Sequence, residues 1–162
     1  MILIALGANL PSREGPPAAT LQAALRELAR NDVGVLAVSP FYGSRAWPDP
    51  RDPDFVNAVA RLATPREPDA LLSLLKEIEI SFGRLSTQRN APRPLDLDLL
   101  DYDGRIRKRP PVLPHPRLQE RGFVLVPLKE LAPDWRHPVS GLSVRELLDA
   151  LPAEASELTR LP

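Results

Sequence analysis

The chain has 162 residues, of which 21 are basic, 21 are acidic and none is cysteine. This length suits one compact domain, so we expect residues 1–162 to fold as a single unit. The net charge of zero gives no general attraction to nucleic acid or membranes, and the lack of cysteine excludes disulfides, thiolate metal sites and a cysteine nucleophile. The apolar opening, residues 2–6, is too short for a signal peptide or membrane span, so we expect a cytoplasmic protein.

Apolar periodicity in the first hundred residues predicts alternating strands and helices. Three stretches rich in aliphatic, β-branched or aromatic residues predict strands, at residues 1–6, 33–42 and 55–62. Two stretches with apolar residues at helical spacing predict helices, at residues 16–31 and 68–82, and Gly83 suits the left-handed end of the second. The long, proline-rich residues 43–53 predict a functional loop instead of a tight hairpin.

A further strand is predicted where the chain reads Pro-Arg-Pro-Leu-Asp-Leu-Asp-Leu-Leu, at residues 92–100. Side chains alternate between the faces of a strand, so Leu95, Leu97 and Leu99 point one way and Asp96 and Asp98 point the other way. Two carboxylates about 6–7 Å apart on one face can converge on a hard cation such as Mg²⁺. The alternative is a half-exposed sheet edge with two solvated aspartates.

The predicted order is strand, helix, strand, strand, helix, strand, which is that of the ferredoxin-like split βαβ arrangement. We therefore expect an α+β fold with an antiparallel sheet and helices packed on it. The C-terminal third forms an extension of this core. In that extension residues 123–126 predict another strand, and Ser143 with Glu146 predicts the capping box of a last helix.

Three arginines precede the two aspartates within ten residues, namely Arg84, Arg89 and Arg93. Phosphoryl transfer needs positioning, a divalent ion and cationic side chains that absorb developing charge, so this grouping suits a phosphate ligand. The chain has no Walker loop and no GxGxxG motif, so side chains would have to hold any nucleotide. The alternative for each single arginine is a solvated surface position.

Four other side chains are candidates for a binding site. His115 stands between two prolines, where a fixed backbone can aim the imidazole at a phosphate, although a lone histidine is more often structural. Phe55 and Phe123 lie at or near the starts of predicted strands, and core packing is their alternative role. Asn57 shares a strand face with Phe55 and would be costly in a core unless it were hydrogen-bonded.

Short motifs in a fixed order extend over most of the chain, at residues 7–10, 39–42, 55–59, 78–79 with 83–84, 92–98, 114–117 and 121–125. Together they resemble the 6-hydroxymethyl-7,8-dihydropterin pyrophosphokinases of folate biosynthesis, and the Pro-Arg-x-Leu-Asp-Leu-Asp segment is the most specific of them. The resemblance covers residues 1–135 and implies a ferredoxin-like αβα sandwich. It also implies transfer of the β,γ-pyrophosphoryl unit of ATP to the pterin hydroxymethyl group, with two Mg²⁺ ions and release of AMP.

The resemblance implies a role for each matching residue. The catalytic residues would be Arg84, Arg93, Asp96 and Asp98, with both ions held by Asp96 and Asp98. The ATP-binding residues would be Glu79, Arg84, Arg89, Arg93, Leu99, His115 and Arg121. The substrate-binding residues would be Ser44, Trp47, Phe55, Asn57, Asp96 and Phe123. In this set the two phenylalanines would stack on the pterin ring, and Asn57 would read its polar edge.

The sequence departs from the family pattern at several positions. Asn90 and Ala91 stand where the family usually has Trp-Gly, Ala8 replaces the usual Ser, and Pro116 replaces a Tyr of some members. The polar residues 84–91 predict a mobile lid that excludes water when it closes. The lack of the usual Trp predicts that this lid loses part of its closing contact.

Two other functions remain open from the residues alone. A metal-dependent phosphohydrolase would use the same aspartates and arginines with water as the acceptor. A ferredoxin-like RNA-binding module would use the same fold, but the neutral charge and few aromatic residues count against it. We therefore expect small-molecule substrates, no nucleic acid, no membrane, and a monomer or weak homo-oligomer.

Overall fold

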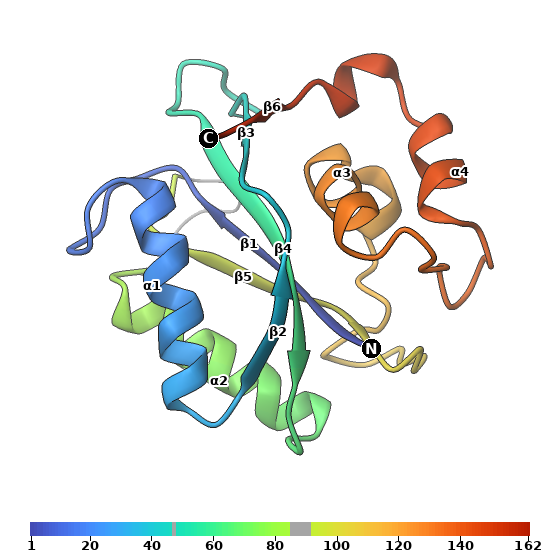
Figure 1. The fold of residues 1–162 in the computed structure, drawn as a ribbon, viewed down its shortest axis with the longest axis horizontal. Helices are drawn as coiled ribbons and strands as arrows, with labels where there is room; N and C mark the ends of the chain where they lie inside the picture. Colours follow the sequence, from blue (N-terminus) through green and yellow to red (C-terminus); the bar gives the residue numbers. More distant parts are fainter. Residues whose placement is uncertain (47, 85–91) are drawn as a thin grey trace.

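The computed structural model describes residues 1–46, 48–84 and 92–162, and Figure 1 shows the path of the chain. The strands are β1 Ile2–Ala8, β2 Gly34–Val38, β3 Tyr42–Ser44, β4 Phe55–Ala63, β5 Asp96–Tyr102 and β6 Thr159–Arg160. The helices are α1 Pro17–Arg30, α2 Pro68–Ser81, α3 Gly122–Leu131 and α4 Val144–Asp149, with short 3-10 turns η1 Leu118–Glu120 and η2 Ala153–Ser156. The protein is therefore α+β, as predicted.

The strands form one antiparallel sheet in the order β5-β1-β4-β3-β6, and β2 also pairs with β4. Near the end of β1, Gly7 pairs with Asn57 of β4 on one side and with Asp96 of β5 on the other. Adjacent strands are about 4.8 Å apart, so Asn57 and Asp96 lie about 10 Å apart across Gly7. Directly paired residues point to the same side of a sheet, which brings both candidates to one face.

One face of the sheet packs against α1 and α2 (Figure 1). Apolar residues from three strands and both helices form this first core, including Ile4, Leu6, Leu28, Leu75 and Leu97. Proline at the first turn of each helix suits its N-terminus, because the missing N–H would have no intrahelical partner there. This face is occupied by packing along the length of β1 and β5.

The opposite face is divided between packing and an open surface. At one end, Leu3, Val59 and Leu100 pack against α3 and α4 in a second core. At the other end, the same face of β1 and β5 continues with Gly7, Asp96 and Asp98, which line a large cavity, as does Ala5. The helices α3 and α4 therefore cover only part of this face.

The prediction of one continuous strand over residues 33–42 was wrong. β2 ends at Val38, and β3 begins at Tyr42 after Pro40, which has no N–H to donate to a neighbouring strand. Ser39 bridges the break, because its N–H donates to the Val59 carbonyl at 2.9 Å and its hydroxyl accepts the Val59 N–H at 3.0 Å. Both short strands therefore still pair with β4.

The prediction of a strand at residues 123–126 was also wrong, because these residues lie in α3. Val124, Leu125 and Leu128 recur at helical spacing, and all three are buried against the sheet. Four β-forming residues are too short a window to separate a strand from a buried helix, and packing overrides their local preference. Phe123 consequently sits on the first turn of a helix.

Two predicted helix ends were confirmed. Gly83 has φ of +92° just after α2, and Ser143 and Glu146 form a reciprocal capping box at the start of α4. The predicted lid, apart from Arg84, lies outside the described residues. Among the helices of the described ranges, each is too short or too polar to cross a bilayer.

Candidate active site

Strand β5 presents its two aspartates on the open part of the sheet. Leu95, Leu97 and Leu99 are at most 4 % exposed, whereas Asp96 and Asp98 keep 28 % of their side-chain surface accessible. This alternation is the one expected for a strand whose two faces meet different surroundings. The predicted separation of a leucine face and an acidic face was confirmed.

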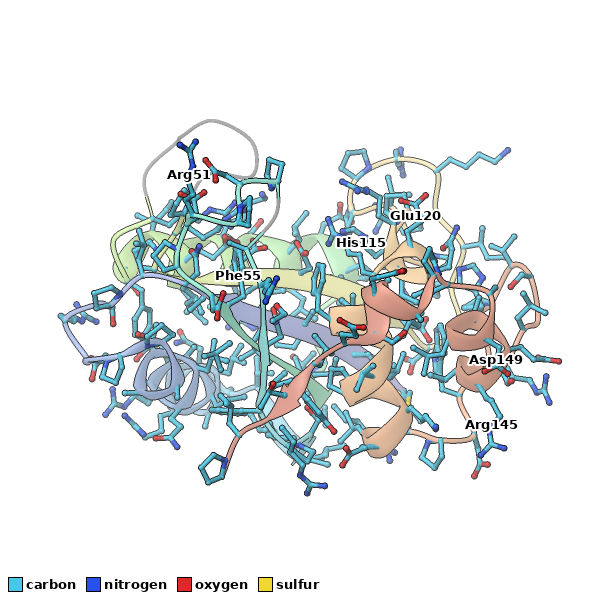
Figure 2. The ribbon with its side chains drawn as sticks, turned by 90° about the horizontal axis from the view of Figure 1, so that it is seen from above. Arg51, Phe55, His115, Glu120, Arg145 and Asp149 are labelled. Atoms are coloured by element: carbon cyan, nitrogen blue, oxygen red, sulfur yellow. The ribbon has the colours of Figure 1, made fainter. Side chains whose placement is uncertain are left out.

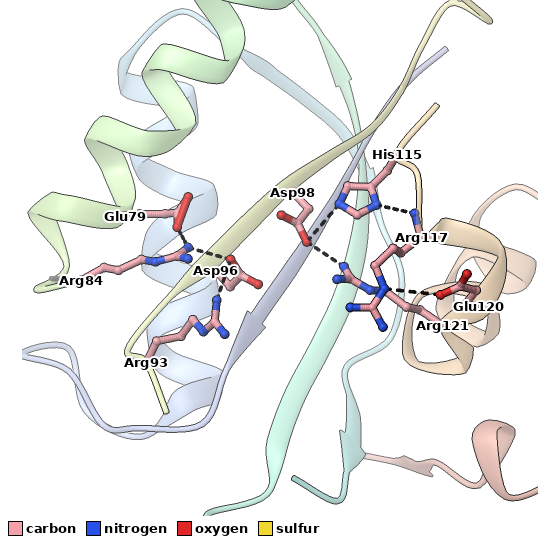
Figure 3. A network of polar contacts seen from close by, with 9 residues as sticks. All are labelled: Glu79, Arg84, Arg93, Asp96, Asp98, His115, Arg117, Glu120 and Arg121. Atoms are coloured by element: carbon pink, nitrogen blue, oxygen red, sulfur yellow. Dashed lines mark hydrogen bonds and ion pairs between the residues drawn. The ribbon is translucent and has the colours of Figure 1, made fainter. Parts of the chain in front are cut away.

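Asp96 lies among cations that come from both sides of the undescribed segment (Figure 3). Arg84 Nη1 is 2.6 Å from Asp96 Oδ1, and Arg93 Nη1 is 3.6 Å from the same oxygen. Arg84 also pairs with Glu79, which is buried in the last turns of α2. The left-handed Gly83 ends the helix and turns the chain, and the Arg84 N–H then donates to the Glu79 carbonyl at 3.1 Å.

Asp98 has a separate set of partners from the region after β5. Arg121 Nη1 donates to Asp98 Oδ2 at 3.1 Å, and His115 Nε2 lies 3.9 Å from the same oxygen. His115 Nδ1 accepts the backbone N–H of Arg117 at 3.2 Å, so in the neutral imidazole the proton is on Nε2 and faces Asp98. The backbone N–H of His115 donates to the Leu100 carbonyl at 2.8 Å, and this hydrogen bond attaches the loop to β5.

The two aspartates influence each other electrostatically. Desolvation raises the pKa of Asp98, and the charge of Asp96 raises it further, whereas His115 and Arg121 oppose the shift without cancelling it. Desolvation likewise lowers the pKa of His115, although the charge of Asp98 acts in the other direction. A divalent cation between the carboxylates would remove their repulsion, so the pair is electrostatically suited to bind one.

A second group of predicted residues lies two strands away from the aspartates. Asn57 is only 5 % exposed, and its Nδ2 donates to Ser44 Oγ at 2.8 Å, so its burial is compensated by a hydrogen bond. Phe55 pairs with Ser44 across β3 and β4 and is half-buried. Phe123 approaches from α3, with the Arg121 guanidinium 5.6 Å from its ring centre.

Two cavities lie around these residues. The larger, about 1690 Å³, is lined by both groups, including Ser44, Phe55, Asn57, Arg93, Arg121 and Phe123. The smaller, about 250 Å³, is lined by residues of α2, β5 and the loop after β5, including Leu72, Lys76, Glu79, Leu99, His115 and Pro116. Both cavities are lined by Arg84, Asp96 and Asp98, which therefore lie between them.

The structure thus brings most predicted site residues to one side of the molecule. In the view of Figure 2, Phe55, His115 and Glu120 lie along the same side, and Arg145 and Asp149 lie farther away in the C-terminal part. Trp47 and Arg89 fall outside the described residues, so their predicted roles remain predictions.

Some residues at the site had no role in the sequence prediction. Asn9 is buried, its Oδ1 accepts the Arg93 N–H at 2.9 Å, and its Nδ2 donates to the Pro53 carbonyl at 3.1 Å. It therefore links the segment that carries Arg93 to the loop before β4. Two sequence signals pointed to Asn9: its position in a loop directly after a strand, and its place in the family motif at residues 7–10. Arg117 also lines the larger cavity, with its Nε 3.3 Å from Glu120.

The fold and the site define an α+β protein in which paired carboxylates and arginines separate two cavities, an arrangement suited to a phosphate-bearing ligand. A sequence model of the 7,8-dihydro-6-hydroxymethylpterin-pyrophosphokinase family matches residues 3–133. The chain therefore belongs to this family.

Curated relatives agree with this assignment. The 2-amino-4-hydroxy-6-hydroxymethyldihydropteridine pyrophosphokinase of Pseudomonas aeruginosa is 42 % identical over 163 residues, covering 99 % of this chain and 96 % of the relative. The protein of the same name from Synechocystis is 39 % identical over 155 residues, covering 94 % and 77 %. The folic acid synthesis protein fol1 of Pneumocystis carinii is 34 % identical over 151 residues, covering 93 % of this chain but 20 % of that larger protein.

Proposed function

We propose that this chain transfers the β,γ-pyrophosphoryl unit of ATP to the hydroxymethyl group of 6-hydroxymethyl-7,8-dihydropterin in folate biosynthesis, giving AMP and the pterin diphosphate. Its family membership supports an ATP-dependent diphosphotransferase and gives no support to the phosphohydrolase or RNA-binding alternatives. The observation that carries the proposal is that Arg84, Asp96 and Asp98 lie between two cavities. Phosphates held at these residues would leave one cavity for each ring system.

Asp96 and Asp98 would hold the Mg²⁺ that accompanies ATP, and we propose two ions. Within the described ranges no three His, Cys, Asp or Glu side chains converge as a complete protein cage. Mg²⁺ is commonly bound by one or two carboxylates together with waters and substrate phosphates, so the pair of aspartates is a fitting donor set. When bound, the metal neutralises charge on the phosphate oxygens.

The cationic side chains would bind and orient the triphosphate from two directions. Arg84 and Arg93 reach it from the Asp96 side, and His115 and Arg121 reach it from the Asp98 side. Glu79 holds the Arg84 guanidinium in place before the nucleotide binds, so binding does not have to order this side chain. We retain Arg89 as a further ATP-binding residue on the basis of the family resemblance.

The reaction needs orientation more than covalent help from the protein. The acceptor hydroxyl oxygen forms a bond to the β-phosphorus, the bond from that phosphorus to the oxygen shared with the α-phosphate breaks, and AMP leaves with the electron pair while the hydroxyl proton is released. Because preorganised guanidinium groups need no rearrangement as charge moves to the leaving group, Arg84 and Arg93 are the proposed catalytic arginines.

The smaller cavity would take the adenine and ribose. Leu99 provides an apolar contact there, while Glu79 and Lys76 provide polar groups. The cavity lies on the side of β5 nearer to α2, so the nucleotide would enter beside the helix that carries Glu79.

The larger cavity would take the pterin. Phe55 at the start of β4 and Phe123 on the first turn of α3 both line this cavity and would stack on the pterin ring, while Asn57 and Ser44 would read its polar edge. Asp96 would lie near the hydroxymethyl group, because it separates this cavity from the phosphate-binding residues. Trp47 is retained as a substrate-binding residue from the family resemblance.

At the level of the whole chain, we propose a ferredoxin-like αβα sandwich that acts as a single domain over residues 1–162. The sheet order β5-β1-β4-β2 with helices after β1 and β4 supports this arrangement. We also propose a cytoplasmic monomer or weak homo-oligomer with small-molecule substrates and no nucleic-acid partner.

An assay with ATP, MgCl₂ and 6-hydroxymethyl-7,8-dihydropterin, with AMP as the measured product, tests the proposal. AMP should form at a rate that depends on the pterin and should equal the pterin diphosphate in amount. Addition of EDTA in excess of the magnesium should stop the reaction. AMP or inorganic phosphate formed at the same rate without pterin would identify a hydrolase instead.

A further inference from the structure

The chain after α4 returns to the larger cavity. The C-terminal segment, residues 153–161, passes α3 and ends beside β3 (Figure 1). Six of its residues line the larger cavity, namely Glu154, Ala155, Glu157, Leu158, Thr159 and Leu161. The family match ends at residue 133, and no site residue was predicted from the sequence in this segment. Its position against the cavity therefore requires a separate explanation.

One attachment of the segment is to the first residue of α3. A Cβ atom at Gly122 would lie 1.6 Å from the carbonyl oxygen of Ala155 and 2.5 Å from its carbonyl carbon. The backbone of Ala155 therefore occupies the space where any other residue at position 122 would carry a side chain. Phe123 follows directly and is 38 % exposed at the cavity. The contact fixes the helical turn from which this ring extends.

The other attachment is to the outer edge of β3. Thr159 and Arg160 of β6 pair with Gly43 and Tyr42, and the Leu161 N–H donates to the Phe41 carbonyl at 2.8 Å. The other edge of β3 pairs with β4, where Ser44 accepts the hydrogen bond from Asn57. The segment consequently connects the strand that orients Asn57 to the helix that carries Phe123.

A surface ion pair adds a third link between the same elements. Arg160 Nη1 is 3.4 Å from Glu130 Oε2 of α3, and the Tyr42 hydroxyl also contacts Glu130. Arg160 is 63 % exposed, so this ion pair contributes little free energy by itself. The close backbone packing at Gly122 and the pairing with β3 are the stronger attachments.

We propose that residues 153–161 are a positioning element for the flat heterocycle of the acceptor substrate, an inference that rests on the proposed function. The segment sets the separation between the Phe123 ring on α3 and the Asn57–Ser44 pair on β4 and β3. Stacking depends on ring separation and offset, so a displaced first turn of α3 would lose the stack. The nucleotide cavity is lined by other elements, so nucleotide binding should depend much less on this segment.

Two substitutions test the two attachments separately in the full-length chain. Leu161→Pro removes the N–H that donates to Phe41, and the preceding Arg160 is already in a strand, the conformation that a following proline favours. Leu161→Ala is its matched control, because it shortens the side chain but keeps the N–H. Gly122→Ala places a methyl group against Ala155 and should displace the segment from α3.

Calorimetric titration then gives two dissociation constants for each variant, one for a non-hydrolysable ATP analogue with Mg²⁺ and one for the pterin added to that complex. We expect Leu161→Pro and Gly122→Ala to raise the pterin dissociation constant about five- to tenfold, the value of one aromatic stack. The analogue dissociation constant should stay close to that of the parent chain in both variants. The melting temperature of Leu161→Pro should also stay close to parental, whereas that of Gly122→Ala should fall because its methyl group meets backbone atoms of Ala155. Leu161→Ala alters the cavity wall but keeps the attachment, so it should raise the pterin dissociation constant clearly less than Leu161→Pro does.

Three results would overturn the inference. Parental pterin affinity in Leu161→Pro would show that the attachment to β3 is not needed. Equal weakening of both ligands together with a large drop in melting temperature would assign the segment a structural role only. An equal loss in Leu161→Ala would assign the effect to the side chain and not to the attachment. If the parent chain itself bound no pterin, both the proposed function and this inference would fail.

Discussion

The two faces of the sheet differ in what covers them. The face under α1 and α2 buries a continuous row of aliphatic side chains, whereas the opposite face is packed by α3 and α4 at one end and lines the large cavity at the other. Leu97 and Asp98 are neighbours in sequence, yet one is 2 % exposed in the core and the other faces the site. A strand with two such faces can anchor a site rigidly, because the core fixes the backbone that the aspartates share.

The largest expected effect is the loss of activity from a change on the open face. Asp98→Asn keeps the size of the side chain but removes the charge of a proposed metal ligand, so the turnover rate should fall about a thousandfold or more. The melting temperature should stay the same or rise slightly, because the burial of the Asp98 charge and its repulsion from Asp96, which together raise the pKa of Asp98, are both removed. AMP formation and thermal unfolding are the two measurements.

Asp149→Asn is the matched control, since Asp149 is exposed at the end of α4 and does not line either cavity. It should retain the parental turnover rate. Near-parental activity of Asp98→Asn at saturating Mg²⁺ would contradict the metal assignment.

Substitution of the adjacent residue, Leu97, should lower the stability of the protein and not its turnover rate. Leu97→Ala removes a buried side chain from the first core and should lower the free energy of unfolding by about 2–5 kcal/mol. At a temperature where the variant is folded, its turnover rate at saturating ATP should remain close to parental, because Leu97 points away from the larger cavity and touches only the smaller one. Urea unfolding and the AMP assay measure the two effects. Lost activity with unchanged stability would show that the two faces are not independent.

The third aspartate of β5, Asp101, lies on the same strand as Asp96 and Asp98 but has a structural role and no proposed role in the reaction. Asp101 is 3 % exposed, and its carboxylate accepts hydrogen bonds from Trp135 Nε1 at 2.8 Å and from the Gly104 N–H at 3.0 Å. Asp101→Ala leaves these donors without their acceptor and should cost about 1–3 kcal/mol of unfolding free energy. The rate of AMP formation should not change. Asp101→Asn, which keeps one acceptor oxygen, should lose less stability.

The periodicity of the sequence was sufficient to predict the helices that cover the first core and the strand that carries Asp96 and Asp98. Alternation of leucine and aspartate predicted that Asp96 and Asp98 share a face, and helical spacing predicted α1 and α2. These elements were predictable because their local pattern and their burial agree. The family resemblance, and not periodicity, supplied the grouping of Ser44, Phe55 and Asn57 with the aspartates.

The divided face was harder to predict because its elements depend on contacts between distant residues. Residues 123–126 have the composition of a strand, and only burial of Val124, Leu125 and Leu128 against the sheet makes them helical. The role of Asn9 depends on partners at Arg93 and Pro53, which lie far away in the sequence. The contact of Ala155 with Gly122 likewise has no local signal.

A smaller effect should distinguish phenylalanines on the two faces. Phe123→Ala removes a proposed stacking partner and should raise the pterin dissociation constant by about five- to tenfold, with little change in melting temperature because the ring is 38 % exposed. Phe82→Ala is the comparison, because Phe82 is 5 % exposed in the first core. It should lower the melting temperature and leave the pterin affinity of the folded protein unchanged. A lower melting temperature of Phe123→Ala with unchanged pterin affinity would show instead that Phe123 contributes to packing.

The smallest expected effect concerns α4, at the covered end of the divided face. Hydrogen bonds from the Ser143 backbone and side chain lower the pKa of Glu146 below its ordinary value of 4.5. The charged form is thus favoured in the folded state, so its stabilisation is present above the ordinary pKa and is lost as the pH falls through the lowered value. Glu146→Gln keeps an oxygen for the Ser143 N–H but does not titrate. Its melting temperature should be slightly below the parental value at pH 7, and the difference should shrink below about pH 4.

Ser143→Ala removes the cap itself and should be less stable at every pH. A parent-to-Gln difference that stays constant across this range would show that the charge of Glu146 does not contribute to the cap, and none of these changes should alter AMP formation at neutral pH.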